Sequence, residues 1–83
     1  MNLNYITGTV IDIIRETVIT DKEIELGTIL VSDLGADSFD TVLISNAIED
    51  EFSIIIDDGF MVNDKLTVKD IVDKVSSLVS CSA

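Results

Sequence analysis

Apolar side chains recur at three- and four-residue steps in three separate stretches of the chain. The first stretch runs from Leu3 to about Ile19, the second from Ser38 to about Phe52, and the third follows Thr67. This spacing places apolar residues on one face of a helix, so each stretch is predicted to form an amphipathic helix. The predicted buried face of the second helix comprises Phe39, Val42, Leu43, Ala47, Ile48 and Phe52.

Helix-start patterns mark the second and third stretches. Asp37 precedes Asp40 by three residues, and Thr67 precedes Asp70 by the same spacing. This is the spacing of a capping box, in which each side chain accepts a hydrogen bond from the other residue's backbone amide. The second helix is therefore predicted to begin at Asp37 and Ser38, and the last helix at Thr67.

The connections between these helices complete the predicted fold. Residues 20–36 lack a sustained helical period, so they are expected to form a long, structured loop whose apolar residues pack on the core. Residues 53–66 have room for one short helix between turns, with a brief strand at residues 54–56 as the alternative. The predicted fold is all-α: an irregular four-helix bundle with three longer helices, one short helix and a long first loop.

Composition narrows the class of protein. A chain of 83 residues with a mean hydropathy of +0.47 is expected to fold as a single domain over residues 1–83 with one core. Five basic and sixteen acidic residues give a net charge of −11, which repels nucleic acid and anionic membranes and favours basic protein partners. The N-terminal residues lack a basic start and an apolar run, so no signal peptide or membrane span is predicted.

Cysteine and histidine usage argues against several kinds of chemistry. Cys81 is the single cysteine, so no internal disulfide is expected and its thiol is predicted to lie free in the C-terminal tail. A reducing compartment is the simpler assumption for such a chain, so we predict a cytoplasmic protein, and we expect it to be a monomer. The chain has no histidine, which excludes Ser-His and Cys-His nucleophiles assembled within it, and makes a zinc site unexpected. Its isolated glycines match neither a P-loop nor a dinucleotide fingerprint. No metal site and no catalytic residue are therefore predicted.

Ser38 stands at the start of the second predicted helix, where an outside enzyme could reach its hydroxyl. Taken alone, a serine at such a position is usually a helix cap. Its flanking residues 33–42, DLGADSFDTV, resemble the modification motif of the acyl carrier protein family. The resemblance continues through residues 47–52, and more loosely covers the length, acidity and helix order of the whole chain.

This resemblance implies a non-enzymatic carrier. Ser38 would bear a covalent 4′-phosphopantetheine arm attached by a phosphopantetheinyl transferase. The arm would carry acyl intermediates as thioesters to partner enzymes of fatty-acid or related lipid and polyketide biosynthesis. In the family, acyl chains can lie between the helices. The candidates for such a lining, for each of which core packing is the simpler description, are Ile48, Phe52, Ile56 and Met61.

Partner docking is expected along the second helix. The candidate docking residues are Asp37, Asp40, Leu43, Glu49 and Asp50. Capping is the alternative role of Asp40, and solubility is the alternative role of the acids near the helix end. Phe39 replaces the leucine usual in the family, and Leu43 stands where a housekeeping carrier tends to place an acid. A specialised carrier is expected, whose partners read apolar contacts as well as charge.

Three other functions stay open from the sequence. A carrier of amino acids, as in peptide synthesis or alanyl transfer, would share the modified serine and the fold. An acidic interaction module would use Ser38 only as a cap. An enzyme would need Ser38 to act with one of the five basic residues, and no spacing points to such a pair.

Overall fold

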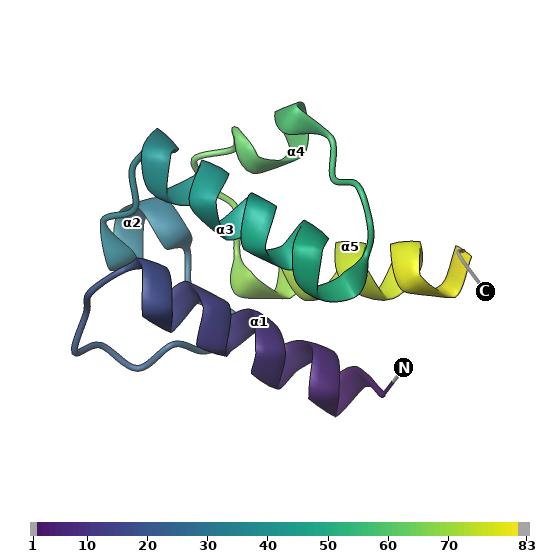
Figure 1. Ribbon diagram of the computed structural model, residues 1–83. Helices are drawn as coiled ribbons and strands as arrows, with labels where there is room; N and C mark the ends of the chain where they lie inside the picture. The colour runs from purple at the N-terminus through teal and green to yellow at the C-terminus, as the bar shows by residue number, and fades with distance from the viewer. Residues whose placement is uncertain (1, 82–83) are drawn as a thin grey trace.

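The computed structural model describes residues 2–81, except for the side chains of Asp58 and Cys81, so the predicted tail thiol lies outside the described part. Its helices are α1 (Leu3–Thr17), α2 (Leu30–Leu34), α3 (Ser38–Phe52), α4 (Asp58–Met61) and α5 (Val68–Cys81). Figure 1 shows α1 packed beneath α3, with α4 above α3 and α5 running behind. The prediction of an all-α fold is confirmed, and α2 is an additional helix.

Helix α1 follows its predicted pattern closely. Asn2 caps it, because the Asn2 side-chain oxygen accepts a hydrogen bond from the Asn4 amide at 2.7 Å. Ile6, Val10 and Ile14, four residues apart, are buried against α3 and α5. The helix ends at Thr17, two residues before the predicted end.

Helix α2 lies inside the segment that was predicted to be a loop. Ile29 precedes it without a side-chain cap, but the Leu30 amide donates to the Leu66 carbonyl at 3.1 Å. Leu30 and Leu34 are buried, as expected for this segment. A five-residue helix has little stability of its own, so contacts with residues far along the chain stabilise it.

Helix α3 begins and ends where predicted, but it buries a different face. Its buried residues are Thr41, Ile44, Ile48 and Phe52. The prediction was wrong for Phe39, Val42 and Leu43, which are 69%, 54% and 41% exposed. Apolar residues surround most of this helix, so their spacing alone did not select the face that packs on α1.

The segment after α3 contains the predicted short helix, α4, and no strand. Ser53 ends α3 in the left-handed conformation, with φ of 55°. The Ile56 amide then donates to Glu49 Oε2 at 2.8 Å, so this amide is not available to a strand partner. The alternative of a strand at residues 54–56 was therefore wrong. Within residues 2–81, the sole β-type pairing is an isolated bridge between Ile29 and Thr67.

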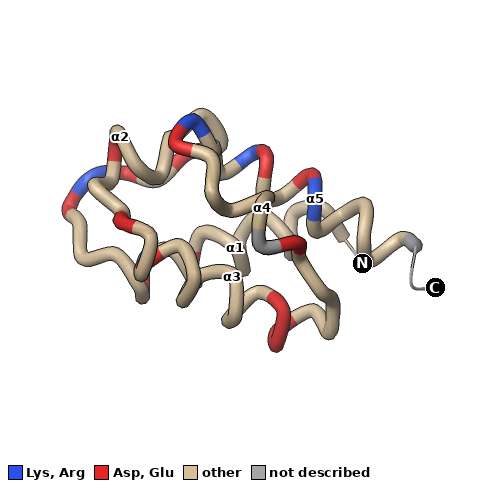
Figure 2. Tube along the Cα trace, turned by 90° about the horizontal axis from the view of Figure 1, so that it is seen from above, with Lys and Arg blue, Asp and Glu red and all other residues tan. Residues whose placement is uncertain are grey.

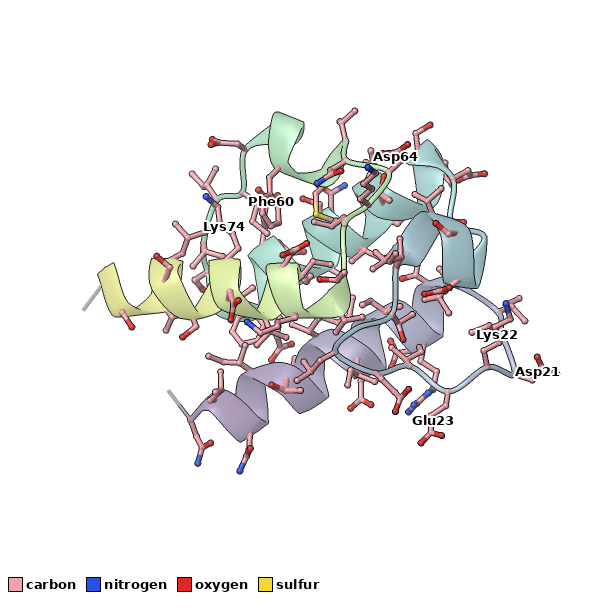
Figure 3. All side chains as sticks on the ribbon, turned by 180° about the vertical axis from the view of Figure 1, so that it is seen from behind. Asp21, Lys22, Glu23, Phe60, Asp64 and Lys74 are labelled. Atoms are coloured by element: carbon pink, nitrogen blue, oxygen red, sulfur yellow. The ribbon has the colours of Figure 1, made fainter. Side chains whose placement is uncertain are left out.

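Two contacts attach the outer elements to the bundle. Tyr5 on α1 meets Phe52 edge-on, with ring centroids 6.2 Å apart, and its hydroxyl donates to Glu51 at 3.2 Å. On the other side, Lys74 of α5 lies over the ring of Phe60 in α4, with Nζ 5.4 Å from the ring centroid (Figure 3). The first contact joins the C-terminal end of α3 to α1, and the second joins α4 to α5.

The last helix confirms its predicted start. Thr67 Oγ1 accepts from the Asp70 amide, and Asp70 Oδ2 accepts from the Thr67 amide, both at 3.1 Å. These two hydrogen bonds form the predicted capping box. None of the helices in the described part of the chain combines the length and apolar character needed to cross a bilayer.

Candidate functional site

Ser38 is the first residue of α3, and a neighbouring residue caps the helix in its place. Asp37 Oδ1 accepts from the Asp40 amide at 2.9 Å, and Asp40 Oδ2 accepts from the Asp37 amide at 3.3 Å. The Ser38 side chain is exposed, and within residues 2–81 its hydroxyl takes part in no hydrogen bond. The hydroxyl is therefore open to an external reagent rather than occupied by a capping role.

A tight turn places α2 next to this helix start. Gly35 adopts the left-handed conformation, with φ of 71°, and its amide donates to the carbonyls of Leu30 and Val31. Glycine reaches this conformation without steric cost, and the pattern closes the end of α2. Lys22 Nζ also donates to the Asp33 carbonyl at 2.8 Å. The last turn of α2 is thereby held beside Ser38.

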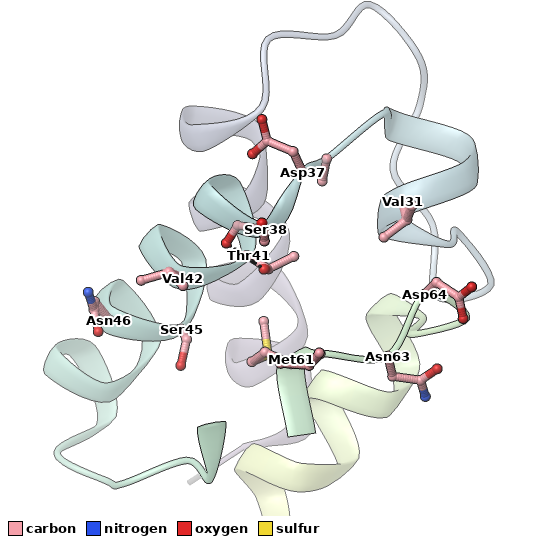
Figure 4. A pocket seen from close by; sticks show the side chains of 12 residues that line it. Val31, Asp37, Ser38, Thr41, Val42, Ser45, Asn46, Met61, Asn63 and Asp64 are labelled. Atoms are coloured by element: carbon pink, nitrogen blue, oxygen red, sulfur yellow. Dashed lines mark hydrogen bonds between the residues drawn. The ribbon is translucent and has the colours of Figure 1, made fainter. Parts of the chain in front are cut away.

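A groove of about 370 Å³ begins at Ser38 and runs between α3 and the segment around α4 (Figure 4). Its lining residues are Val31, Ala36, Asp37, Ser38, Thr41, Val42, Ser45, Asn46, Met61, Val62, Asn63 and Asp64. They come from α2, the turn after it, α3, and the segment that begins at the end of α4. The groove therefore exists only once these segments pack together.

The groove has an apolar floor and polar side chains that include the hydroxyls of Ser38 and Ser45. Ala36 and Met61 are buried in this floor, and Val31 lines it from α2. Thr41 Oγ1 is engaged, since it donates to the Ser38 carbonyl at 2.9 Å. Ser45 is half-buried, and no group among residues 2–81 hydrogen-bonds its hydroxyl. The groove thus offers apolar contact together with several polar contacts, since Ser38, Asn46 and Asn63 also line it.

Charge is divided sharply between two parts of the chain. Residues 23–64, which include α2, α3 and α4, contain eleven of the sixteen acidic residues and none of the five basic ones. The remaining residues are neutral in sum. Figure 2 shows acidic positions and no basic ones along α3. The surface around Ser38 therefore attracts cations and basic proteins.

Of the predicted docking residues, Leu43 and Asp50 are exposed, whereas Asp37, Asp40 and Glu49 also accept hydrogen bonds from backbone amides. Leu43 is 41% exposed, and Asp50 is exposed on α3. Asp37 and Asp40 use one oxygen each in the capping box, while Asp37 stays exposed and Asp40 is half-buried. Glu49 is half-buried and accepts from the Ile56 amide, so it holds the loop that follows α3.

Of the four residues predicted to line an acyl-chain site, one lines the groove and three do not. Met61 lines the groove beside Ser38. Ile48, Phe52 and Ile56 are buried in the core and do not line the groove. Ser45 was not among the predicted site residues, although it stands seven residues after Ser38, which is two turns along the same helix.

Comparison with known proteins agrees with this geometry. The family model described as "phosphopantetheine attachment site" matches residues 5–75, which include all five described helices except the first two residues of α1 and the last part of α5. No curated protein matches the chain. An exposed serine hydroxyl without an internal partner, beside an apolar groove, suits covalent attachment of such an arm. Since the match spans most of the sequence, this chain belongs to the family of phosphopantetheine-bearing carrier domains, whose covalent prosthetic group is 4′-phosphopantetheine.

Proposed function

We propose that this chain is an acyl carrier protein whose arm is attached to Ser38 Oγ. The observation that carries the proposal is the division of roles at the start of α3, where Asp37 caps the helix and the Ser38 hydroxyl is left exposed. The arm supplies a thiol that holds an acyl group as a thioester. In this function the chain delivers acyl intermediates of fatty-acid or related lipid and polyketide biosynthesis, and its partner enzymes perform the chemistry.

The helix start favours a phosphodiester only weakly. Free amides and the positive pole of α3 stabilise an anion there by a few tenths to about 1 kcal/mol. The carboxylates of Asp37 and Asp40 oppose this stabilisation. A covalent bond to Ser38, rather than charge, is therefore the means by which the group is retained, and tethering raises the concentration of the cargo at each docked enzyme.

The exposed face of α3 supports docking by both charge and apolar contact. Phe39 and Leu43 are four residues apart on the helix and are 69% and 41% exposed. Asp37, Asp40 and Asp50 accompany them on this base-free helix. We infer a partner surface with an apolar centre and surrounding lysine or arginine residues, as expected for a specialised carrier.

A mass measurement tests the attachment. The unmodified chain is incubated with coenzyme A and a broad-specificity phosphopantetheinyl transferase, and intact mass is measured. The wild type and the control Ser77→Ala, which changes an exposed serine on α5, should each gain one arm, and Ser38→Ala should gain none. An unchanged wild type, or a mass gain in Ser38→Ala, would contradict the proposal.

A carrier of amino acids is the second candidate. The base-free acidic segment 23–64 supports it, because such a surface attracts the ammonium group of an aminoacyl load. The mass of the load on the chain purified from its native source separates the two candidates. A simple acyl mass supports the first candidate, and an amino-acid mass supports the second.

A further inference from the structure

The two ends of α2 are held to the rest of the chain in different ways. At its N-terminal end the Leu30 amide donates to the Leu66 carbonyl at 3.1 Å, which is a bond between backbone groups. At its C-terminal end the Asp33 carbonyl accepts from Lys22 Nζ at 2.8 Å. This second end leads through residues 34–37 to Ser38, so a side chain from another segment holds the backbone that enters the modification motif.

Lys22 is placed for this contact by its own loop. Its amide donates to Thr20 Oγ1 at 3.1 Å, which fixes a local turn. Figure 3 shows Lys22 on the loop between α1 and α2, together with its sequence neighbours Asp21 and Glu23. The last carbonyls of a helix lack partners within the helix, and a lysine is well suited to supply one.

The charge of Lys22 is unfavourable for docking a basic partner. It is the sole basic residue in the sequence between residues 16 and 64, which otherwise contribute acidic groups to the surface around Ser38. A cation in this region weakens the attraction of that surface for a basic protein. Its hydrogen bond to Asp33, rather than its charge, is therefore the contribution that Lys22 makes to the motif.

Buried apolar residues alone do not fix this turn as closely. Leu34 and Ala36 are buried on either side of Gly35. Apolar burial is not directional, whereas a hydrogen bond fixes both the distance and the angle of the carbonyl that accepts it. The bond from Lys22 thus limits how far the end of α2 can rotate or shift relative to the start of α3.

We propose that Lys22 is a positioning residue for the modification of Ser38, because its bond to the Asp33 carbonyl keeps the turn at residues 35–37 in the arrangement that the phosphopantetheinyl transferase binds. This inference rests on the proposed attachment at Ser38. Lys22 acts through the Asp33 backbone and contacts neither the serine nor the arm. When the bond is lost, a smaller fraction of the chains has the competent turn, and the apparent affinity for the transferase falls in proportion.

Steady-state kinetics of the transferase with the full chain as its substrate test this role. In Lys22→Met the KM for the chain should rise about 3- to 10-fold, the range for one hydrogen bond, with kcat unchanged. Lys22→Arg keeps a cationic donor and should have a KM close to that of the wild type. Lys65→Met is the control for charge, because Lys65 is exposed and its loss makes the chain more acidic by the same amount. Its KM should be equal to or lower than the wild-type value, since the partner is basic.

Hydrogen exchange in the unmodified chain separates local release of the turn from general loss of stability. The Ala36 amide donates to the Leu30 carbonyl at 3.0 Å, so it reports on the C-terminal end of α2. Its exchange should quicken about 3- to 10-fold in Lys22→Met. Exchange of the Leu30 amide, which is bonded to Leu66, should stay at the wild-type rate.

Each outcome bears on a different claim. A wild-type KM in Lys22→Met, or an equal rise in Lys65→Met, would overturn the role of Lys22 while leaving the attachment at Ser38 intact. Equal quickening of the Ala36 and Leu30 amides would show that Lys22 only stabilises the fold, which also overturns the role. A wild-type chain that gains no arm would contradict the attachment and the role of Lys22 together.

Discussion

Asp37 and Asp40 each accept a hydrogen bond from the other's backbone amide at the start of α3. Asp37 Oδ1 lies 2.9 Å from the Asp40 amide nitrogen, and Asp40 Oδ2 lies 3.3 Å from the Asp37 amide nitrogen. This reciprocal pair satisfies two amides that would otherwise lack partners at a helix start. It also relieves Ser38 of the capping role that a serine usually takes there. Because these two carboxylates form the cap, the Ser38 hydroxyl is left available for covalent modification.

Loss of the Asp37 cap should destabilise the chain. Asp37→Ala is expected to lower the free energy of unfolding by about 1 kcal/mol, since the Asp40 amide loses its side-chain acceptor. Asp37→Asn should lose less, because an asparagine oxygen still accepts that hydrogen bond. Urea unfolding followed by circular dichroism measures both. Equal stability of Asp37→Ala and the wild type would show that the cap contributes nothing.

A negative charge at Leu43 should impair the carrier with its own partners. Leu43→Glu removes an exposed apolar contact, so kcat/KM of an enzyme from the same pathway should fall about tenfold, typical of losing one well-packed interface residue. Ile19→Glu is the matched control, because Ile19 is 99% exposed and lies outside α3. The same turnover in both variants would argue against apolar recognition by α3.

The contact between Lys74 and Phe60 should steady α4. Lys74→Met keeps the aliphatic stem but removes the cation, so hydrogen exchange at the Phe60 and Met61 amides should quicken about 2- to 5-fold. Lys65→Met is the control, because it changes the net charge equally and the Lys65 side chain makes no such ring contact in the described part of the chain. Equal exchange in both variants would mean that this contact does not hold α4.

The left-handed backbone at Ser53 should be a source of strain. Ser53→Gly is expected to raise the free energy of unfolding by up to about 1 kcal/mol, since glycine adopts a φ of 55° without the steric cost of a side chain. Ser77→Gly, in the interior of α5, should lower it by about 0.5 to 1 kcal/mol. Thermal unfolding compares the two, and a destabilised Ser53→Gly would refute this account of the turn.

Salt should stabilise the fold by screening. All of the net charge of −11 falls within residues 23–64, so raising ionic strength from low to physiological should raise Tm by about 5 °C. The described residues form no group of three or more ligands that could hold a metal ion. If screening alone accounts for the effect, magnesium and sodium chloride at equal ionic strength should act equally. An unchanged Tm would exclude screening, and a larger effect of magnesium would point to specific binding.

The helix ends that the sequence predicted most accurately were those with their own local hydrogen bonds. The capping boxes at Asp37 and Thr67 use residues three positions apart, so their partners can be identified without the fold. Helix α2 has no such cap, and it depends on a hydrogen bond from Leu30 to Leu66, thirty-six residues away. Its local features are Asp33 Oδ2, which accepts from the Ile29 amide at 2.8 Å, and Gly35 at its end, and these lie in a segment without a sustained helical period.

The sequence by itself determined that the chain is helical and acidic, and that Ser38 stands at a helix start within a recognisable motif. Local spacing and local caps carry that information. Only the tertiary structure decided which face of α3 is buried, and hence that Phe39 and Leu43 are exposed. It also brought Ser45 and Met61 to one groove. Apolar residues surround α3, so packing against α1 and α4, rather than periodicity, selects its buried and exposed faces.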